Sequence, residues 1–284
     1  MSISFILIVF LFHLAAGMMM VLPLLPTQKV AREFLQSVSF WSALFLALAF
    51  IFQKFTPFHL PESFGYALDP AGPLIRSSRA LVLLFFLITL IFWARLRFTE
   101  RPITGLRTAA IGLLAGVAVV GVNLLFRPLQ LTPSWVINFA VPFNFVSASL
   151  LLGGFLVGML FGHSYLLNTE VPKRLLVTMS WVMMGTIALR VVSVVTTLLL
   201  FNYLVFPGTQ FLDKMISFAG HGIFFWQRIL VGLVIPIGVA VMTWRTALIG
   251  SNQSATGIMY VGVAFILIGE LMSTYLFFLS GIPL

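Results

Sequence analysis

Three charged residues lie inside long apolar stretches of the sequence, Arg190, Arg228 and Glu270. Arg228, for example, follows Gln227 in the middle of the otherwise apolar run FFWQRILVGL. A guanidinium group in hydrocarbon costs about a few kcal/mol on insertion scales, so it persists only where it faces protein, water or an opposite charge. These residues are therefore candidates for a buried binding or proton-transfer site, with a purely structural ion pair as the alternative.

The stretches that hold these charges have the length of membrane spans. The chain has 284 residues, of which 61% are hydrophobic and 8% charged, and its mean hydropathy is +1.12. An α-helix of about 20 apolar residues crosses a bilayer, and eight such runs occur: 3–25, 38–56, 79–97, 107–126, 143–166, 175–205, 221–244 and 256–279. The runs lack the alternation of β-barrel strands. The sequence predicts an all-α polytopic transmembrane bundle in one integral membrane domain, 1–284, whose first span is retained and not cleaved as a signal peptide.

The connections between the runs carry unequal positive charge. Alternate connections hold nine Lys and Arg residues on one face and five on the other. The nine are Lys29, Arg32, Arg95, Arg97, Arg101, Arg107, Lys173, Arg174 and Arg245, and the five are Lys54, Arg76, Arg79, Arg127 and Lys214. Because cytoplasmic loops carry the excess, both termini are expected on the non-cytoplasmic side. The net charge of +9 then reflects topology and lipid headgroup contact, and no nucleic-acid-binding motif occurs.

The depths of the three charges follow from the helical rise of 1.5 Å per residue. Arg228 and Glu270 each lie about 10 Å below the outer boundary, and Arg190 lies roughly 22 Å above the inner end of its run, which is the same outer third of the bilayer. An ion pair between Arg228 and Glu270 is the simplest account of both charges. Arg190 then needs Glu270 as a shared partner, a hydroxyl such as that of Ser193, or a polar ligand.

Histidines provide a second set of candidates. His221 lies at the outer mouth of the seventh run, His13 in mid-span and His163 at the inner end of the fifth run. A bis-histidine haem needs two imidazoles at one depth, but His13 and His221 are roughly 15 Å apart vertically. This spacing disfavours a simple haem b pair, although an axial Met18 or Met159 keeps non-covalent haem b open. For His13 the alternative is an interhelical hydrogen bond.

The chain contains no cysteine. It therefore cannot form disulfides, thiolate-ligated zinc or iron–sulfur sites, or covalent c-type haem. The H-E-x-x-H, P-loop and serine-hydrolase signatures are also absent. We expect no metal site and no catalytic residues of a stand-alone enzyme, so any redox centre is non-covalent or belongs to a partner.

Small residues and prolines indicate how the helices pack. Gly154, Gly158 and Gly162 recur four apart in GGFLVGMLFG, a pattern that permits close helix contact. Pro236 is expected to free the carbonyl near Gly232 and bend the helix one turn below Arg228. The Pro- and aromatic-rich external segments at 54–79 and 126–144 are expected to lie on the outer membrane face or to cap the bundle. Interfacial anchoring by their aromatic residues, such as Tyr66 and Trp135, is the alternative.

Residues 143–280 resemble the quinol-interacting membrane anchor subunits of the dimethyl-sulfoxide reductase and polysulfide reductase type. Eight helices with external termini, RILVGLVIPIG followed by a polar turn, and AFILIGELMSTYL near the end of the sequence carry the resemblance. Ser273 and Thr274 depart from it, because a further arginine would be natural there.

The resemblance implies an anchor subunit of an electron-transfer complex in the bacterial inner membrane. Such a subunit would bind quinone or quinol near the outer face and exchange electrons with an iron–sulfur or cytochrome partner. Arg190, Arg228, Glu270 and His221 offer the donors and acceptors that quinol oxygens need, and the aromatic residues 224–226 could pack on its ring. A haem-b electron carrier, a non-catalytic scaffold subunit and a transporter are the alternatives.

Overall fold

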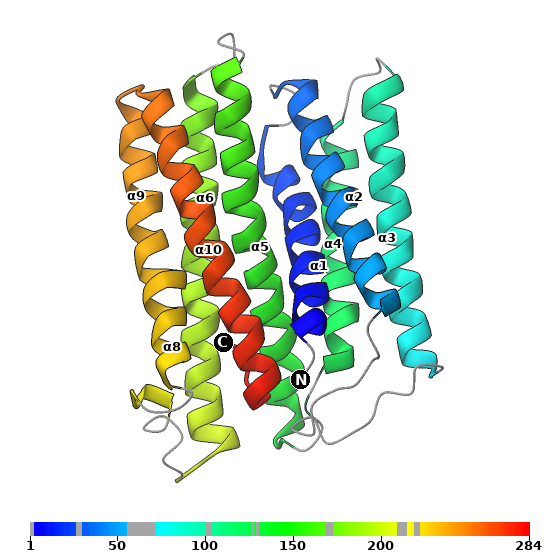
Figure 1. Cartoon of the computed structure of the whole chain (residues 1–284), viewed down its shortest axis with the longest axis vertical. Coiled ribbons are helices and arrows are strands. Elements are labelled where there is room, and N and C mark those ends of the chain that lie inside the picture. The colour runs from blue at the N-terminus through cyan, green and yellow to red at the C-terminus, as the bar shows by residue number, and fades with distance from the viewer. Residues whose placement is uncertain are drawn as a thin grey trace.

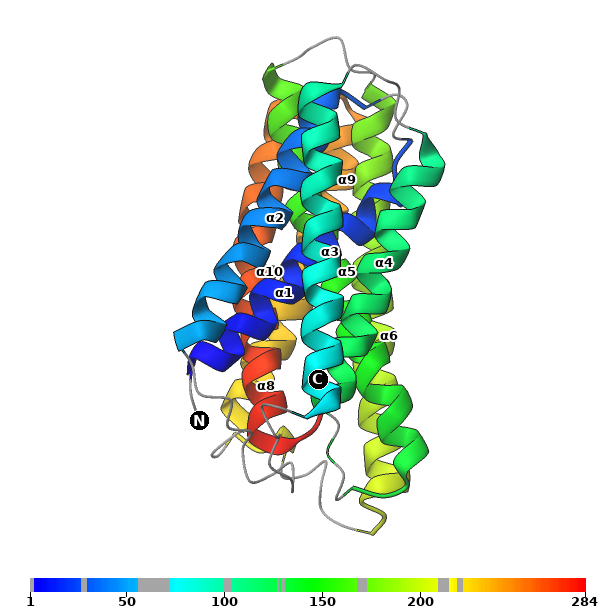
Figure 2. The same cartoon turned by 90° about the vertical axis from the view of Figure 1, so that its right-hand side faces the viewer.

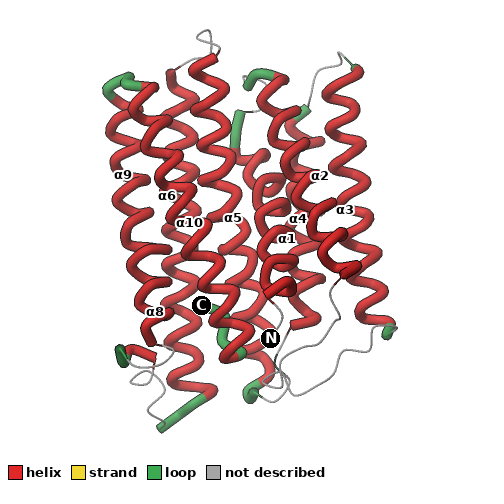
Figure 3. The backbone as a smooth tube through the Cα atoms, viewed as in Figure 1, coloured by secondary structure: helices red, strands yellow, loops and turns green. Residues whose placement is uncertain are grey.

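In the computed structural model, the described part of the chain is almost entirely helical (Figure 3). The structure describes residues 3–26, 30–55, 72–99, 104–126, 128, 131–167, 173–208, 215–218 and 222–284. Within these ranges there is no strand, and eight helices are long and apolar enough to cross a membrane. The predicted polytopic helical bundle of eight spans is confirmed.

Several spans include a local change of helix type. The helices are α1 (Ile3–Val21), α2 (Arg32–Phe55), α3 (Pro73–Phe98), α4 (Gly105–Asn123), α5 (Ser134–Leu167), α6 (Lys173–Leu200), α8 (Gly222–Ile229), α9 (Ile235–Leu248) and α10 (Asn252–Ser280). Short 3₁₀ turns η1 (Leu22–Leu24) and η4 (Leu124–Phe126) extend α1 and α4, and π-helical turns η5 (Phe201–Val205) and η6 (Leu230–Val234) follow α6 and α8. Helices α8 and α9 form one span through η6.

Consecutive spans run antiparallel, so both ends of the chain lie at the same end of the bundle (Figure 1). At the opposite end α2, α4 and α6 begin and α3 and α9 finish (Figure 1). The first or last turns of these helices hold the basic residues Arg32, Arg95, Arg97, Arg107, Arg174 and Arg245. There the side chain of Arg32 donates hydrogen bonds to the backbone oxygens of Leu96 and Arg95, at 2.7 and 3.2 Å. That this basic end faces the cytoplasm stays a prediction from the charge asymmetry.

Helix α1 lies in the middle of the bundle (Figure 2) and is its most enclosed span. It packs against α5, α2 and α4, while α10 packs against α5 and α9. Helix α3 is the least enclosed and presents Leu83, Leu87 and Ile91 outward. An apolar outward face of this kind is suited to lipid contact.

Helix α5 begins earlier than the sequence indicated. The expected external segment at 126–144 is wrong over its second half, since residues 134–144 form the first turns of α5 with Pro142 inside the helix. Proline is tolerated in membrane helices, because neighbouring helices and polar side chains satisfy the backbone groups that it frees. Most of the other expected external segment, 54–79, lies outside the described residues, although α3 already begins at Pro73.

The glycine pattern marks close helix contacts, as predicted. An added Cβ would lie 2.6 Å from Thr186 Oγ1 at Gly154, 2.9 Å from Met183 Sδ at Gly158, and 2.8 Å from Thr256 Oγ1 at Gly162. Helix α6 therefore approaches the first two glycines, and α10 the third.

The tightest contact of this helix involves a glycine outside the predicted pattern. Gly153 of α5 faces the backbone of Gly17 in α1, and a Cβ at Gly153 would overlap it. We expect Gly153→Ala to reduce the free energy of unfolding by about 1–3 kcal/mol through overpacking. Thermal unfolding in detergent would measure the loss. Gly257→Ala is the matched control, because a Cβ there meets no atom within 4 Å; equal stability of the two variants would contradict the prediction.

Candidate functional site

The three charged residues predicted to converge do meet in the structure. Arg190 of α6, Arg228 of α8 and Glu270 of α10 have exposed fractions of 0%, 0% and 2%. Arg228 Nη2 lies 2.8 Å from Glu270 Oε1, so the predicted ion pair is confirmed. Glu270 is also shared with Arg190, whose Nε and Nη2 donate to Oε1 at 3.0 Å and to Oε2 at 2.8 Å. We call Arg190, Arg228 and Glu270 the charge cluster.

Arg190 is the most fully coordinated member of the charge cluster. Its Nη1 donates to the backbone oxygen of Asn144 at 3.0 Å, to Asn144 Oδ1 at 2.5 Å and to Ser147 Oγ at 3.2 Å. Its Nη2 also donates to Ser273 Oγ at 2.9 Å and to the Leu284 backbone oxygen at 2.8 Å. Arg190 thus ties α6 to α5, to α10 and to the segment after α10.

The hydroxyl suggested for Arg190 from the sequence is not its partner. Ser193 Oγ is buried and has no hydrogen-bond partner among the described residues. Asn144 and Ser147, which do bind Arg190, fall in or next to the segment taken as external. Because they are three residues apart in a helix, they lie on the same face of it. The sequence would have indicated this shared face if the fifth span had been predicted to start before residue 143. Ser273 stands three residues after Glu270 and shares its face for the same reason.

Residues 281–284, which follow α10, pack beside Arg190. Gly281 adopts a left-handed conformation at the end of α10, with φ of 73°, and turns the chain back into the bundle. The Leu284 backbone oxygen also accepts a hydrogen bond from Ser273 Oγ, and Asn144 Nδ2 donates to the Pro283 oxygen at 3.2 Å. Ile282 and Leu284 are buried. The polar contacts of Arg190 are therefore closed off from the surroundings.

Arg228 differs from Arg190 in leaving donors unused. Only its Nη2 forms a hydrogen bond, whereas its buried Nε and Nη1 have no partner among the residues that the structure describes. The charged side chains of the cluster are two guanidinium groups and one carboxylate, so Glu270 alone does not balance both arginine side chains. A buried cation with unpaired donors is costly unless an acceptor reaches it.

The helix is irregular near Gly232, where Pro236 was expected to disturb it. The helix changes to the π-helical turn η6 immediately after α8, and Pro236 follows near the start of α9. Gly232 in η6 packs against the backbone of Gly269 in α10, and a Cβ at Gly232 would lie 2.5 Å from Arg228 Nη1. The two glycines thereby let α8 and α10 approach closely enough for Arg228 to reach Glu270. Turns of this type are frequent at functional sites.

His13 belongs to a polar pair beside the charge cluster. It is buried, with 2% exposure, and its Nε2 lies 3.3 Å from Asn123 Oδ1 of α4. Its ring centroid lies 4.8 Å from that of Phe145, the residue after Asn144. The expected interhelical hydrogen bond is present, and a ligand role for His13 stays a hypothesis.

His163, the other described histidine, does not join this site. His163 lies near the end of α5 that is far from both termini, is exposed, and forms a hydrogen bond of 3.0 Å between Nδ1 and Tyr260 Oη. His221 lies outside the described residues. Among the residues that are described, no group of three or more His, Cys, Asp or Glu could hold a metal ion.

The aromatic residues next to Arg228 have different surroundings. Phe225 is buried, and the ring of Phe224 packs edge-on against Tyr275 at 5.3 Å. Trp226 stacks on Phe218 at 5.5 Å and donates a hydrogen bond of 2.7 Å from Nε1 to the Ile216 oxygen. Each of the three rings therefore packs against another aromatic ring of the protein.

Comparison with known proteins gives no family assignment. No protein-family model and no curated protein matches the sequence. A function for this chain therefore has to be argued from the chemistry of the charge cluster and its neighbours.

Proposed function

We propose that the chain is a quinone-binding membrane subunit of an electron-transfer complex in the bacterial inner membrane. The observation that carries this proposal is the buried pair of unused donors, Nε and Nη1, on Arg228. A quinone has two carbonyl oxygens that accept hydrogen bonds and no donors, so it can supply the acceptors that these two nitrogens lack. The resemblance to quinol-interacting anchors supports the same ligand.

The protein's part in the reaction would be to bind and orient the quinone head. Oxidation of a quinol breaks two O–H bonds and releases two protons and two electrons. The electrons would pass to an iron–sulfur or haem centre of a partner subunit, because this cysteine-free chain cannot ligate a cluster through thiolates. The protons would leave toward the end of the bundle where the termini lie, the predicted outer face.

Glu270 would act as a positioning residue. Its Oε1 holds Arg228 Nη2 at 2.8 Å, and this contact fixes the guanidinium plane while Nε and Nη1 stay without a protein acceptor among the described residues. Because Arg190 binds the same carboxylate through two nitrogens, the carboxylate has little freedom to move. Arg228 is therefore oriented before a ligand arrives, which reduces the entropy lost on binding.

A structural role is the second candidate, and the coordination of Arg190 favours it. Its guanidinium group joins α5, α6 and α10 through at least six hydrogen bonds. A scaffold subunit would need nothing more from the charge cluster. The unused nitrogens of Arg228 are the feature that a scaffold leaves unexplained.

Replacing Arg228 with methionine separates the two roles. The pair of Arg190 and Glu270 stays intact and becomes neutral overall, so we expect unchanged or higher thermal stability. A quinone analogue should bind more weakly by about 1.5–3 kcal/mol, the worth of a hydrogen bond to a charged group, which is roughly 10- to 150-fold in Kd. Calorimetric titration of the protein in lipid nanodiscs would measure this.

Arg245→Met is the control, because Arg245 is exposed at the opposite end of the bundle. Its affinity for the analogue should equal that of the unaltered protein. If Arg228→Met binds the analogue equally well, the charge cluster is structural. Failure of the unaltered protein to bind any quinone analogue would reject the proposed function.

A further inference from the structure

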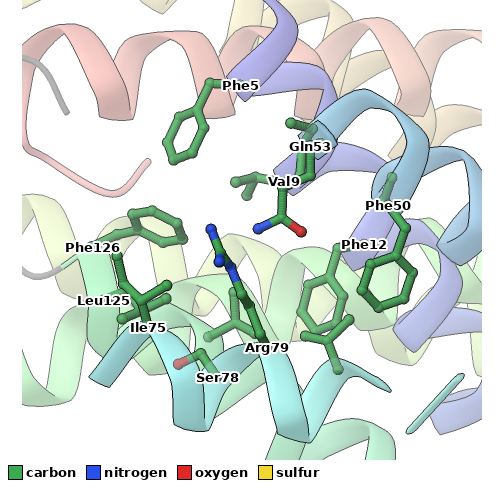
Figure 4. Close-up of a pocket in the computed structure, with 14 residues that line it drawn as sticks. Phe5, Val9, Phe12, Phe50, Gln53, Ile75, Ser78, Arg79, Leu125 and Phe126 are labelled. Atoms are coloured by element: carbon green, nitrogen blue, oxygen red, sulfur yellow. The ribbon is translucent and has the colours of Figure 1, made fainter. Parts of the chain in front are cut away.

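A pocket separate from the charge cluster lies among α1, α2, α3 and α4, at the end of the bundle that holds the termini (Figure 4). It contains about 590 Å³ of space that no atom fills, including its open mouth. Most of its wall is apolar, with the rings of Phe5, Phe12, Phe50 and Phe126 among the lining residues. The polar lining residues are Gln53, Ser78 and Arg79.

Arg79 is the one charged residue among the described residues that line this pocket. Its guanidinium group points into the space, toward the side of the pocket where the Gln53 amide lies (Figure 4). The ion pairs in the described part of the chain both involve Glu270, so none of them neutralises Arg79. Ser78 is occupied by a hydrogen bond of 3.4 Å to the Gly121 oxygen. Among the described residues, the pocket thus offers a cation without an ion-pair partner and an amide, next to a mostly apolar wall.

The pocket opens sideways between α2 and α3. A more open hollow adjoins it and shares Phe50, Gln53 and Arg79, and its other lining residues are Ala80 and Leu83. Leu83 is 48% exposed on the outward face of α3, which is the face suited to lipid contact. A molecule dissolved in the bilayer can therefore enter here without crossing the water phase.

The depth of Arg79 matches the boundary between hydrocarbon and headgroups. Arg79 lies six residues after Pro73, the start of α3, or roughly 9 Å along the helix. Residues 80–94 then carry no charge up to Arg95, a stretch of about 22 Å. The charge-free stretch after Arg79 is therefore consistent with a guanidinium group at the start of the hydrocarbon layer.

We propose that this pocket binds one anionic phospholipid. Its phosphodiester would accept hydrogen bonds from Arg79 and from Nε2 of Gln53, since a guanidinium group matches two phosphate oxygens and supplies the missing counter-charge. One acyl chain would lie along Phe12 and Phe50 and leave past Leu83. A neutral quinone head fits less well, because it would leave the charge of Arg79 uncompensated. This site does not depend on the quinone function.

Native mass spectrometry of the full-length protein extracted from mixed vesicles would test the site. In vesicles of equal phosphatidylglycerol and phosphatidylcholine, we expect one retained phosphatidylglycerol and at least a tenfold preference over phosphatidylcholine. Arg79→Gln should abolish the preference. Arg76→Gln is the matched control, because Arg76 is exposed one turn earlier on α3 and does not line the pocket.

Gln53→Leu provides a second variant that keeps the charge and removes the amide donor. It should weaken phosphatidylglycerol retention less than Arg79→Gln does, and it keeps the proposal testable if Arg79→Gln fails to fold. Equal retention of both lipids by the unaltered protein, or equal loss in Arg76→Gln, would overturn the proposal. Displacement of phosphatidylglycerol by an equal concentration of a quinone analogue would assign the pocket to a neutral ligand instead.

Discussion

Replacing Arg190 with methionine is expected to lower the free energy of unfolding by about 3–5 kcal/mol. Methionine is a flexible apolar side chain that donates no hydrogen bond, so the oxygens of Asn144, Ser147 and Ser273 lose a donor in a buried place. Each unsatisfied buried acceptor costs about 1–3 kcal/mol, partly offset by relaxation. Glu270 would keep Arg228 as its partner, which limits the loss.

Unfolding of purified protein in mixed detergent micelles, followed by tryptophan fluorescence, would measure this difference. Two variants provide the reference: Arg245→Met removes an exposed charge, and Arg228→Met removes the less coordinated member of the charge cluster. Both should stay close to the unaltered protein. An Arg190→Met variant as stable as these two would mean that its hydrogen bonds contribute little to the fold.

The sequence was sufficient to predict the eight spans, because each one needs an uninterrupted apolar stretch that few other structures require. It was less informative about where they end. Helix α2 begins at Arg32, several residues before the predicted start, since its first polar residues find partners at the end of α3: Gln36 Nε2 donates to the Leu96 oxygen at 2.6 Å. Contacts between distant segments of this kind leave no local pattern.

The charge cluster was predictable for a different reason. Depth follows from residue number alone in a helix that spans the membrane, and the cost of an isolated charge requires that these residues find partners. Depth does not tell which way a side chain points around its helix. The sequence therefore favoured a pair between Arg228 and Glu270 but left the partner of Arg190 open among Glu270, a hydroxyl and a ligand. In the structure Glu270 binds Arg190 through both oxygens.

The lipid pocket was not predictable from one sequence. Arg79 was counted among the external charges at the start of its run, and Gln53 lies on a different helix. Their meeting depends on how α2 and α3 pack against α1, which is set by side-chain shapes along all three helices. The unused donors of Arg228 were hidden for the same reason, because a donor counts as unused only once its neighbours are known.

Replacing Glu270 with glutamine should destabilise the protein at least as much as Arg190→Met, by about 3–5 kcal/mol. The variant would leave two buried guanidinium groups without the carboxylate that pairs with both. The amide can still accept one hydrogen bond, but it carries no charge to offset theirs. The same unfolding experiment in micelles would measure the loss.

Adding Arg228→Met to Glu270→Gln gives the sharper test, because it removes the second cation together with the anion. Arg190 would then be the one buried charge of the cluster, and it would keep its bonds to Asn144, Ser147, Ser273 and the Leu284 oxygen. We expect the double variant to be more stable than Glu270→Gln alone by about 1–3 kcal/mol, a coupling typical of residues in direct contact. A double variant less stable than Glu270→Gln would show that Arg228 stabilises the bundle through contacts other than Glu270. The nitrogens of Arg228 that lack a partner among the described residues would then no longer be an argument that this residue binds a ligand.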